Sequence, residues 1–118
     1  MSNEIVLVVE DEFIIRLNAM QIVQDAGYTV LEASNADEAI DILEQRDDIA
    51  IVFTDINMPG SMDGAEMAWI IHRRWPPIAL IVTSGKMLLT SAELPSGRFL
   101  SKPYAQHQLT DALHAAGA

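Results

Sequence analysis

The hydrophobic positions along the chain fall into unbroken runs separated by spaced patterns. Three runs are rich in β-branched residues and about one strand long: Ile5–Val9, Ile49–Phe53 and Ile78–Val82. Unbroken runs of this length are typical of strands buried on both faces of a parallel sheet. Two shorter and more polar runs, Tyr28–Ala33 and Arg98–Ser101, are typical of edge strands or strands late in the chain. The pattern therefore predicts five strands.

Between these runs, apolar residues recur at helical spacing. The spacing predicts helices over Phe13–Ala26, Ala36–Gln45, Asp63–Trp75 and Ala105–Ala116. Asn35 is placed to cap the second helix, with Glu38 three residues later as in a capping box. A further segment, Lys86–Leu94, is the weakest helix prediction because Pro95 and Gly97 cut it short. Strands that alternate with helices predict an α/β fold, with right-handed crossovers placing helices on both faces of a parallel sheet.

Composition and charge narrow the function of this fold. The 118 residues are one domain's worth of chain, and their net charge of −10 repels nucleic acids and anionic lipid surfaces. The absence of cysteine excludes disulfides, thiol nucleophiles and thiolate zinc sites. The first residues, Met1–Glu4, carry an acid where a signal peptide needs a base, and the run that follows is too short to span a membrane. We therefore expect a single cytoplasmic domain over residues 1–118, with no nucleic-acid or membrane partner.

Polar residues follow the predicted strands at the edge where α/β sheets bind their ligands. Glu10 and Asp11 follow the first strand and Asp55 the third, while Thr83 ends the fourth and Lys102 follows the fifth. Three carboxylates at short range repel one another, and a hard cation such as Mg²⁺ relieves the repulsion with oxygen ligands. An ammonium and a hydroxyl can hold the oxygens of a phosphoryl group. The set predicts phosphoryl transfer, with an aspartyl phosphate as the product.

Each of these residues also has a purely structural interpretation. Glu10–Glu12 could begin a helix and complement its dipole, and Asp55 could order the turn that follows it. Thr83 could cap a helix, and Lys102–Pro103 could be an exposed turn. The coincidence of four complementary groups at strand ends of one sheet favours the functional interpretation.

The remaining residues with candidate chemistry favour structural roles. His72, His107 and His114 are isolated on helical patterns and lack the spacing of metal ligands, so we expect them on the solvated surface. Trp69 and Trp75 fall on the third predicted helix, where packing against the core or the sheet is expected.

Five segments together resemble the receiver domains of bacterial two-component response regulators, and the resemblance runs from Val6 to the last helix. The segments are Val8–Glu12, Thr54–Pro59, Met62–Gly64, Val82–Ser84 and Phe99–Tyr104. The resemblance implies a flavodoxin-like receiver fold: a doubly wound, five-stranded parallel sheet built from five βα units, with strand order 2-1-3-4-5.

The resemblance also implies a phosphoacceptor and a metal site. Asp55 matches the phosphoacceptor. Asp11 and Asp55 match ligands of Mg²⁺, Asn57 supplies a ligand through its backbone carbonyl, and Glu10 acts from the outer shell of the metal. Glu10 stands where aspartate is more usual, and its longer arm alters that outer shell. The turn at residues 60–64 is also one residue longer than the commonest form.

A switch is implied as well. Thr83 matches the hydroxyl that turns toward the phosphoryl group, Lys102 its ammonium partner, and Phe99 the aromatic residue that becomes buried when Thr83 moves. The Lys102–Pro103 bond is expected to be cis. The span from Thr83 to Lys102 is shorter than usual in the family, so we expect Lys86–Leu94 to be loosely held and to pack on phosphorylation.

The implied activity is phosphotransfer and autodephosphorylation only. The phosphoryl donor would be a histidine kinase or a histidine phosphotransfer protein. A downstream protein would receive the signal, and the chain would be a monomer or weak dimer. Two alternatives fit the residues less well. A haloacid-dehalogenase-type phosphatase needs a second aspartate where Asn57 stands, and an FMN carrier needs a Ser/Thr/Gly-rich loop where Glu10–Glu12 stands.

Overall fold

Five parallel strands form one sheet at the centre of the protein. The computed structural model describes residues 4–56, 64–84 and 98–117. In these ranges the strand order is β2-β1-β3-β4-β5, as the resemblance implies. The strands are β1 (Ile5–Val9), β2 (Thr29–Ala33), β3 (Ile49–Asp55), β4 (Ala79–Ser84) and β5 (Arg98–Ser101).

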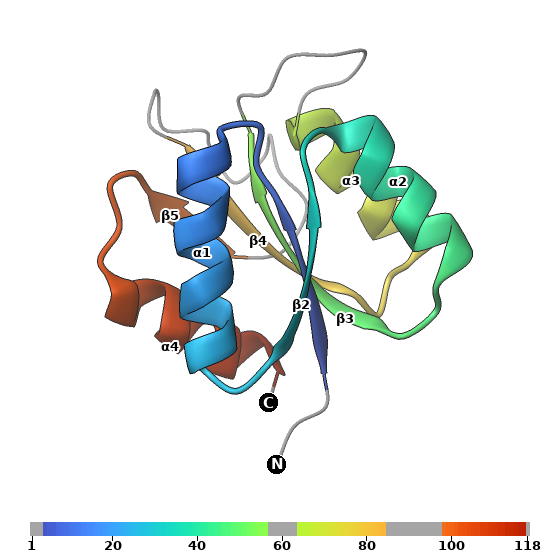
Figure 1. Ribbon diagram of the computed structural model, residues 1–118. Helices are drawn as coiled ribbons and strands as arrows, with labels where there is room; N and C mark the ends of the chain where they lie inside the picture. Colours follow the sequence, from blue (N-terminus) through green and yellow to red (C-terminus); the bar gives the residue numbers. More distant parts are fainter. Residues whose placement is uncertain (1–3, 57–63, 85–97, 118) are drawn as a thin grey trace.

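Helices cover both faces of the sheet (Figure 1). On one face lie α1 (Phe13–Asp25) and α4 (Gln106–Gly117), and on the other lie α2 (Ala36–Gln45) and α3 (Gly64–Arg74). Each predicted helix in the described ranges is present, with bounds that differ by one residue at most, whereas Lys86–Leu94 lies outside the described residues. No helix in the described part of the chain has the length and apolar character needed to cross a membrane.

Alternation along the strands explains why their sequences are unbroken apolar runs. Val6 and Val8 of β1 pack into the core beneath α1 and α4, while Leu7 and Val9 pack into the core beneath α2 and α3. Successive side chains of a strand point to opposite faces, so a strand covered on both faces needs apolar residues at every position. The doubly wound arrangement thus follows from the sequence pattern.

Helix α2 begins with the predicted Asn35 cap, but Glu38 bonds to a different backbone N–H than a standard capping box predicts. The Asn35 side chain accepts a hydrogen bond of 2.8 Å from the backbone N–H of Glu38. Glu38 reaches back to the N–H of Ser34, at 2.7 Å, one residue before the position that a standard capping box uses. The cap supports the first turn as the sequence predicts.

The predicted inward packing of both tryptophans is half wrong. Trp75 packs against the core beneath α2 and α3, but Trp69 is exposed, with its ring nearly perpendicular to the ring of His72. The buried side of α3 is formed by Gly64, Met67, Ala68 and Ile71. Trp69 lies outside that set, because the spacing of these four residues puts them on one face of the helix and position 69 on another.

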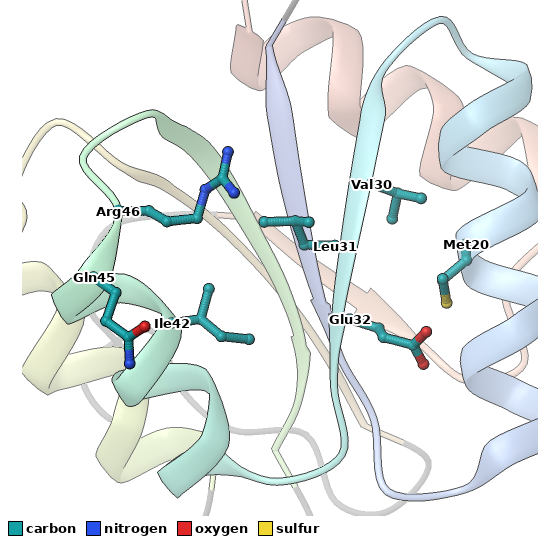
Figure 2. Close-up of a pocket in the computed structure, with 7 residues that line it drawn as sticks. All are labelled: Met20, Val30, Leu31, Glu32, Ile42, Gln45 and Arg46. Atoms are coloured by element: carbon teal, nitrogen blue, oxygen red, sulfur yellow. The ribbon is translucent and has the colours of Figure 1, made fainter.

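An open groove of about 460 Å³ flanks the edge strand β2 (Figure 2). Its lining is largely apolar, with one carboxylate, one amide and one guanidinium: Met20, Val30, Leu31, Glu32, Ile42, Gln45 and Arg46. None of these residues belongs to the predicted phosphorylation site.

Candidate functional site

The register of the sheet brings the predicted site residues to one edge. Asp55, the last residue of β3, pairs with Thr83 of β4. The backbone N–H of Glu10 bonds to the carbonyl of Ala33, and the N–H of Lys102 bonds to the carbonyl of Ser84, at 3.1 and 2.9 Å. The chain therefore leaves β1, β3 and β5 at the carboxyl end of the sheet, where an α/β fold binds its ligands.

Three carboxylates meet at this edge. Glu10, Asp11 and Asp55 each offer an oxygen, and these oxygens lie within 4.8 Å of one another. Glu10 and Asp55 are buried, and Asp11 is partly exposed. With all three ionised and Lys102 protonated, the cluster carries two net negative charges. This is the charge that one divalent cation neutralises.

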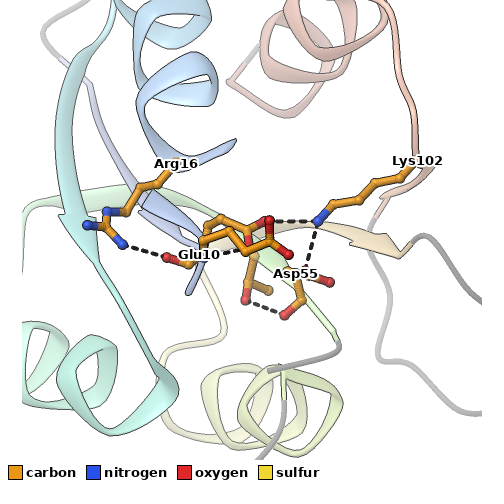
Figure 3. A network of polar contacts seen from close by, with 6 residues as sticks. Glu10, Arg16, Asp55 and Lys102 are labelled. Carbon is orange, nitrogen blue, oxygen red and sulfur yellow. Dashed lines mark hydrogen bonds and ion pairs between the residues drawn. The ribbon is translucent and has the colours of Figure 1, made fainter. Parts of the chain in front are cut away.

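Lys102 bridges two of the acids (Figure 3). Its Nζ donates to Oδ2 of Asp55 at 2.8 Å and to Oε1 of Glu10 at 3.0 Å. Burial of the ammonium favours its neutral form, but the hydrogen bonds and charges of Asp55 and Glu10 outweigh burial and raise the pKa of Lys102. Lys102 is thus a fixed cation in the site, and the interpretation as an exposed turn is wrong.

Glu10 is held by its own loop as well as by Lys102. Its Oε2 accepts a hydrogen bond of 3.2 Å from the backbone N–H of Glu12. Burial raises the pKa of the Glu10 carboxyl, and the charge of Asp55 adds to the effect, while the hydrogen bonds from Lys102 and Glu12 oppose it. The capping interpretation of Glu10–Glu12 is wrong, because Glu12 occupies the N-cap position of α1 without a side-chain cap bond.

The Thr83 hydroxyl is a buried polar group without a hydrogen-bond partner in the described part of the protein. Thr83 is 1% exposed and lies beside Asp55 in the sheet. A buried hydroxyl without a partner costs free energy, which an incoming acceptor can recover. An oxygen of a phosphoryl group on Asp55 is such an acceptor.

The segment after β5 is fixed on the core. The Lys102–Pro103 bond is cis, as the resemblance implies. The Tyr104 ring packs edge-on against the buried ring of Phe53, with ring centres 5.7 Å apart. Phe99 is half-buried on β5 and pairs with Val82 of β4. Phe99 thus lies on the strand next to that of Thr83, and its role as a switch stays a prediction.

Two further residues support the site and were given no role by the sequence patterns. An added Cβ at Gly64 would overlap the backbone carbonyl oxygen of Asp55 and lie 2.7 Å from Cα of Ile56. Arg16 donates to the backbone carbonyl of Glu10 at 2.8 Å. Gly64 stands in a segment that carries the family resemblance, whereas a lone arginine on an amphipathic helix gives no such signal. Asn57 and the turn at residues 60–63 lie outside the described residues.

The donor set fits a hard divalent cation. Carboxylate oxygens, with backbone carbonyls and water, are the ligands that Mg²⁺ prefers, and no sulfur or imidazole ligand belongs to the cluster in the described ranges. The fit rests on the grouping of the three acids and on their excess negative charge.

Comparisons with known proteins identify the family. The response regulator receiver domain matches residues 6–114. The chain is 37% identical to the sensor kinase CckA of Brucella abortus over 109 residues, which are 88% of this chain but only 11% of that protein. It is 29% identical to sporulation initiation phosphotransferase F of Bacillus subtilis over 118 residues, which cover 96% of this chain and 93% of that protein.

Solved structures agree with this result. A response regulator receiver protein of Sinorhizobium medicae superposes with a TM-score of 0.89 at 28% identity, covering 98% of this chain and 94% of that chain. The response regulator TrrA of Thermotoga maritima, solved in complex with Mg²⁺–BeF, gives 0.84 at 25% identity, covering 96% and 98%. The acidic triad of Glu10, Asp11 and Asp55 is typical of the Mg²⁺ site of these domains. The chain therefore belongs to the response regulator receiver domain family of two-component signalling.

Proposed function

We propose that Asp55 accepts a phosphoryl group from a histidine kinase or a histidine phosphotransfer protein, and that this changes the surface presented to a downstream protein. Receiver domains interact with such donors as a family. One observation carries the assignment of the residue: Asp55 both contacts the Lys102 ammonium and pairs in register with Thr83, whose buried hydroxyl has no hydrogen-bond partner among the described residues. Asp55 alone among the three acids has both groups beside it.

The transfer step exchanges one bond for another. An oxygen of the Asp55 carboxylate forms a bond to phosphorus while the phosphorus–nitrogen bond of the donor's phosphohistidine breaks. The electron pair of that bond stays on the imidazole nitrogen, which takes up a proton from solvent. The Lys102 ammonium and the Thr83 hydroxyl donate to oxygens of the transferred group and so offset its charge. Attack of water on phosphorus later releases inorganic phosphate and restores the carboxylate.

The metal would be held by residues of the acidic edge. Asp11 and Asp55 supply carboxylate oxygens, Asn57 its backbone carbonyl, and Glu10 acts from the outer shell through water. When bound, Mg²⁺ supplies positive charge that offsets both the repulsion among the acids and the charge of the phosphoryl group. Lys102 offsets one of the three negative charges through its contacts with Glu10 and Asp55, and a divalent cation would offset the other two.

The response follows from the Thr83 hydroxyl. A phosphoryl oxygen on Asp55 would draw this hydroxyl toward it, and Phe99, half-buried on the adjacent strand, would move into the space released. Phosphorylation then shifts the population between two packings of the β4–β5 face. A downstream protein that prefers one packing binds the phosphorylated form.

The donor would dock on α1. Phe13, Ile14 and Leu17 are 58%, 72% and 43% exposed, and large exposed apolar groups mark interaction sites. A groove of about 580 Å³ joins this helix to the site, because Ile14, Ile15 and Asn18 line it together with Lys102, Pro103 and Tyr104. A protein seated on α1 would thus bring its phosphohistidine beside Asp55.

Residues 1–118 would act as one receiver unit, as a monomer or weak dimer in the cytoplasm. The alignment with the B. subtilis phosphotransferase covers 93% of that protein, so a protein of nearly the same length as this chain supports the proposal.

Intact mass spectrometry tests the proposed acceptor. Incubation with acetyl phosphate and Mg²⁺ should add one phosphoryl group, and chelation by EDTA should prevent it. Asp55→Asn should abolish the adduct, while Asp47→Asn, a change of an exposed aspartate outside the cluster, should leave it unchanged. A full adduct on the Asp55 variant would refute the assignment.

The docking surface has a separate test. Ile14→Glu should slow phosphorylation by a purified phosphohistidine donor protein at least tenfold, while phosphorylation by acetyl phosphate keeps its rate. Gln21→Glu, a change at an exposed position about two turns further along α1, serves as the control. Equal slowing with both donors would show that Ile14 acts on the site and not on docking.

A further inference from the structure

Arg16 links the acidic site to the edge strand β2. Its Nη1 donates to the backbone carbonyl oxygen of Glu10 at 2.8 Å (Figure 3), and its Nε donates to Oε1 of Glu32 at 2.8 Å. The Arg16 side chain is 12% exposed, whereas that of Glu32 is 48% exposed and lines the groove of Figure 2. The guanidinium is therefore a nearly buried cation held between a backbone oxygen and a carboxylate.

Lys102 and the Glu12 N–H hold the Glu10 side chain in the loop before α1, and Arg16 holds its backbone carbonyl. Helix α1 begins at Glu12 without a side-chain cap bond, and its first turn contains no acidic residue. Helix starts are usually stabilised by such a cap, which also fixes the chain that enters the helix. The Arg16 side chain holds the Glu10 carbonyl from one turn inside the helix, where its N–H makes the regular helical bond to the Glu12 carbonyl at 2.9 Å.

The contact bears directly on the geometry of two acids. The carbonyl of Glu10 belongs to the planar peptide unit that joins Glu10 to Asp11. The direction of this carbonyl therefore also sets the direction of the Asp11 N–H and the position of the Asp11 Cα. A guanidinium presents its donors at fixed angles. When Glu32 holds the Nε of Arg16, the direction in which Nη1 donates to the Glu10 carbonyl is therefore fixed as well.

On the basis of the proposed metal site, we infer that Arg16, held by Glu32, is a positioning residue that orients the Glu10–Asp11 peptide so that the acidic cluster binds Mg²⁺. Residues that orient metal ligands without touching the metal change its affinity by roughly 10–100-fold when altered.

Charge alone predicts the opposite effect. Arg16 is a cation near a cation site, so its removal would tighten Mg²⁺ binding if only electrostatics mattered. A positioning role predicts weaker Mg²⁺ binding whenever the two-donor contact of the guanidinium is lost. Arg16→Lys loses this contact but keeps the charge. The conservative variant therefore separates the two explanations.

Isothermal titration calorimetry with MgCl₂ provides the test. Arg16→Gln and Arg16→Lys should both bind Mg²⁺ about tenfold more weakly than the parent, and Glu32→Gln should show a smaller loss. Arg46→Lys is the control, because Arg46 also donates from two nitrogens, to the two oxygens of Asp48 at 2.9 and 2.7 Å, but outside the acidic cluster. This control should keep the parent affinity.

Urea unfolding in EDTA provides the second readout. A merely structural role would lower the free energy of unfolding of the Arg16 variants and leave the Mg²⁺ dissociation constant of their folded form unchanged, which would overturn the inference. Parent affinity in Arg16→Lys, or tighter binding in Arg16→Gln, would also overturn it. A parent protein that gives no Mg²⁺ binding at all would refute the proposed metal site itself, and the role of Arg16 with it.

Discussion

The Nζ of Lys102 lies 2.8 Å from Oδ2 of Asp55, although the two residues are 47 positions apart in the sequence. The contact depends on the sheet register, which brings the ends of β3 and β5 to one edge on either side of β4. It keeps an ammonium group beside the proposed acceptor before any phosphoryl group arrives. The cation is therefore already in place for the transfer step.

Removal of this ammonium should expose the repulsion among the acids. In Lys102→Met, Glu10 and Asp55 lose a buried charged partner, so the free energy of unfolding in EDTA should fall by about 2 kcal/mol. Excess Mg²⁺ should reduce the deficit, because the variant's cluster carries one more net negative charge and should bind the cation more tightly than the parent. Urea unfolding with and without Mg²⁺ measures both effects. Arg46→Met, which breaks an exposed ion pair, should have little effect on stability and show no dependence on Mg²⁺.

Asp11→Asn should separate metal binding from stability. Loss of one charged ligand should weaken Mg²⁺ binding at least tenfold, about 1.4 kcal/mol. The same change removes one of three mutually repelling carboxylates, so the metal-free variant should be as stable as the parent or more stable. Calorimetric titration and urea unfolding report the two quantities, and unchanged Mg²⁺ affinity would remove Asp11 from the ligand set.

Gly64→Ala should damage the site through the backbone. The added methyl group would overlap the carbonyl of Asp55, and the N–H of Gly64 bonds to the carbonyl of Ile56 at 2.8 Å, so α3 has no free direction in which to retreat. We expect a loss of about 3 kcal/mol in stability, together with slower phosphorylation by acetyl phosphate. Gly27→Ala is the control: Gly27 has φ of 99° with open space around it, so backbone strain alone should cost about 1 kcal/mol. A Gly64 variant as stable as the parent would show that the helix shifts freely.

The two tyrosines should make stability fall at high pH. Burial raises the pKa of Tyr28, whose hydroxyl donates to the carbonyl of Leu113 at 3.1 Å, and burial also raises the pKa of Tyr104. The folded protein then keeps protons that the unfolded chain releases above the ordinary value of 10.0. The tyrosine contribution is thus fully present below pH 10 and is lost as the pH rises through the raised values. Titration of phenolate absorbance in Tyr28→Phe and Tyr104→Phe assigns each step, and ordinary tyrosine titration in the folded protein would contradict this account.

The sequence predicts the sheet and the grouping of the site well, for a physical reason. Strands covered on both faces need apolar residues at every position, so Ile5–Val9 is visible as a run, and the ends of parallel strands must meet at one edge. These two rules predict that Glu10, Asp55, Thr83 and Lys102 lie together, and the contacts in the structure agree.

Other features depend on three-dimensional packing that patterns do not record. The exposure of Trp69 depends on which face of α3 packs against the sheet, and the role of Gly64 depends on the position of the Asp55 carbonyl. Arg16 resembles any polar residue of an amphipathic helix until the structure shows its two partners, Glu10 in the loop after β1 and Glu32 in β2. Such contacts join segments that are distant in the sequence, and hydrophobic periodicity carries no information about them.

The central claim is that Asp55 itself carries the phosphoryl group, and chemical mapping of the adduct tests it most directly. Borohydride reduces an acyl phosphate to an alcohol, so protein phosphorylated by acetyl phosphate and Mg²⁺ should contain homoserine in place of aspartate after reduction. Tandem mass spectrometry should locate that homoserine at position 55, with unphosphorylated protein as the control. Reduction at Asp11 or at any other carboxylate, with position 55 intact, would contradict the account.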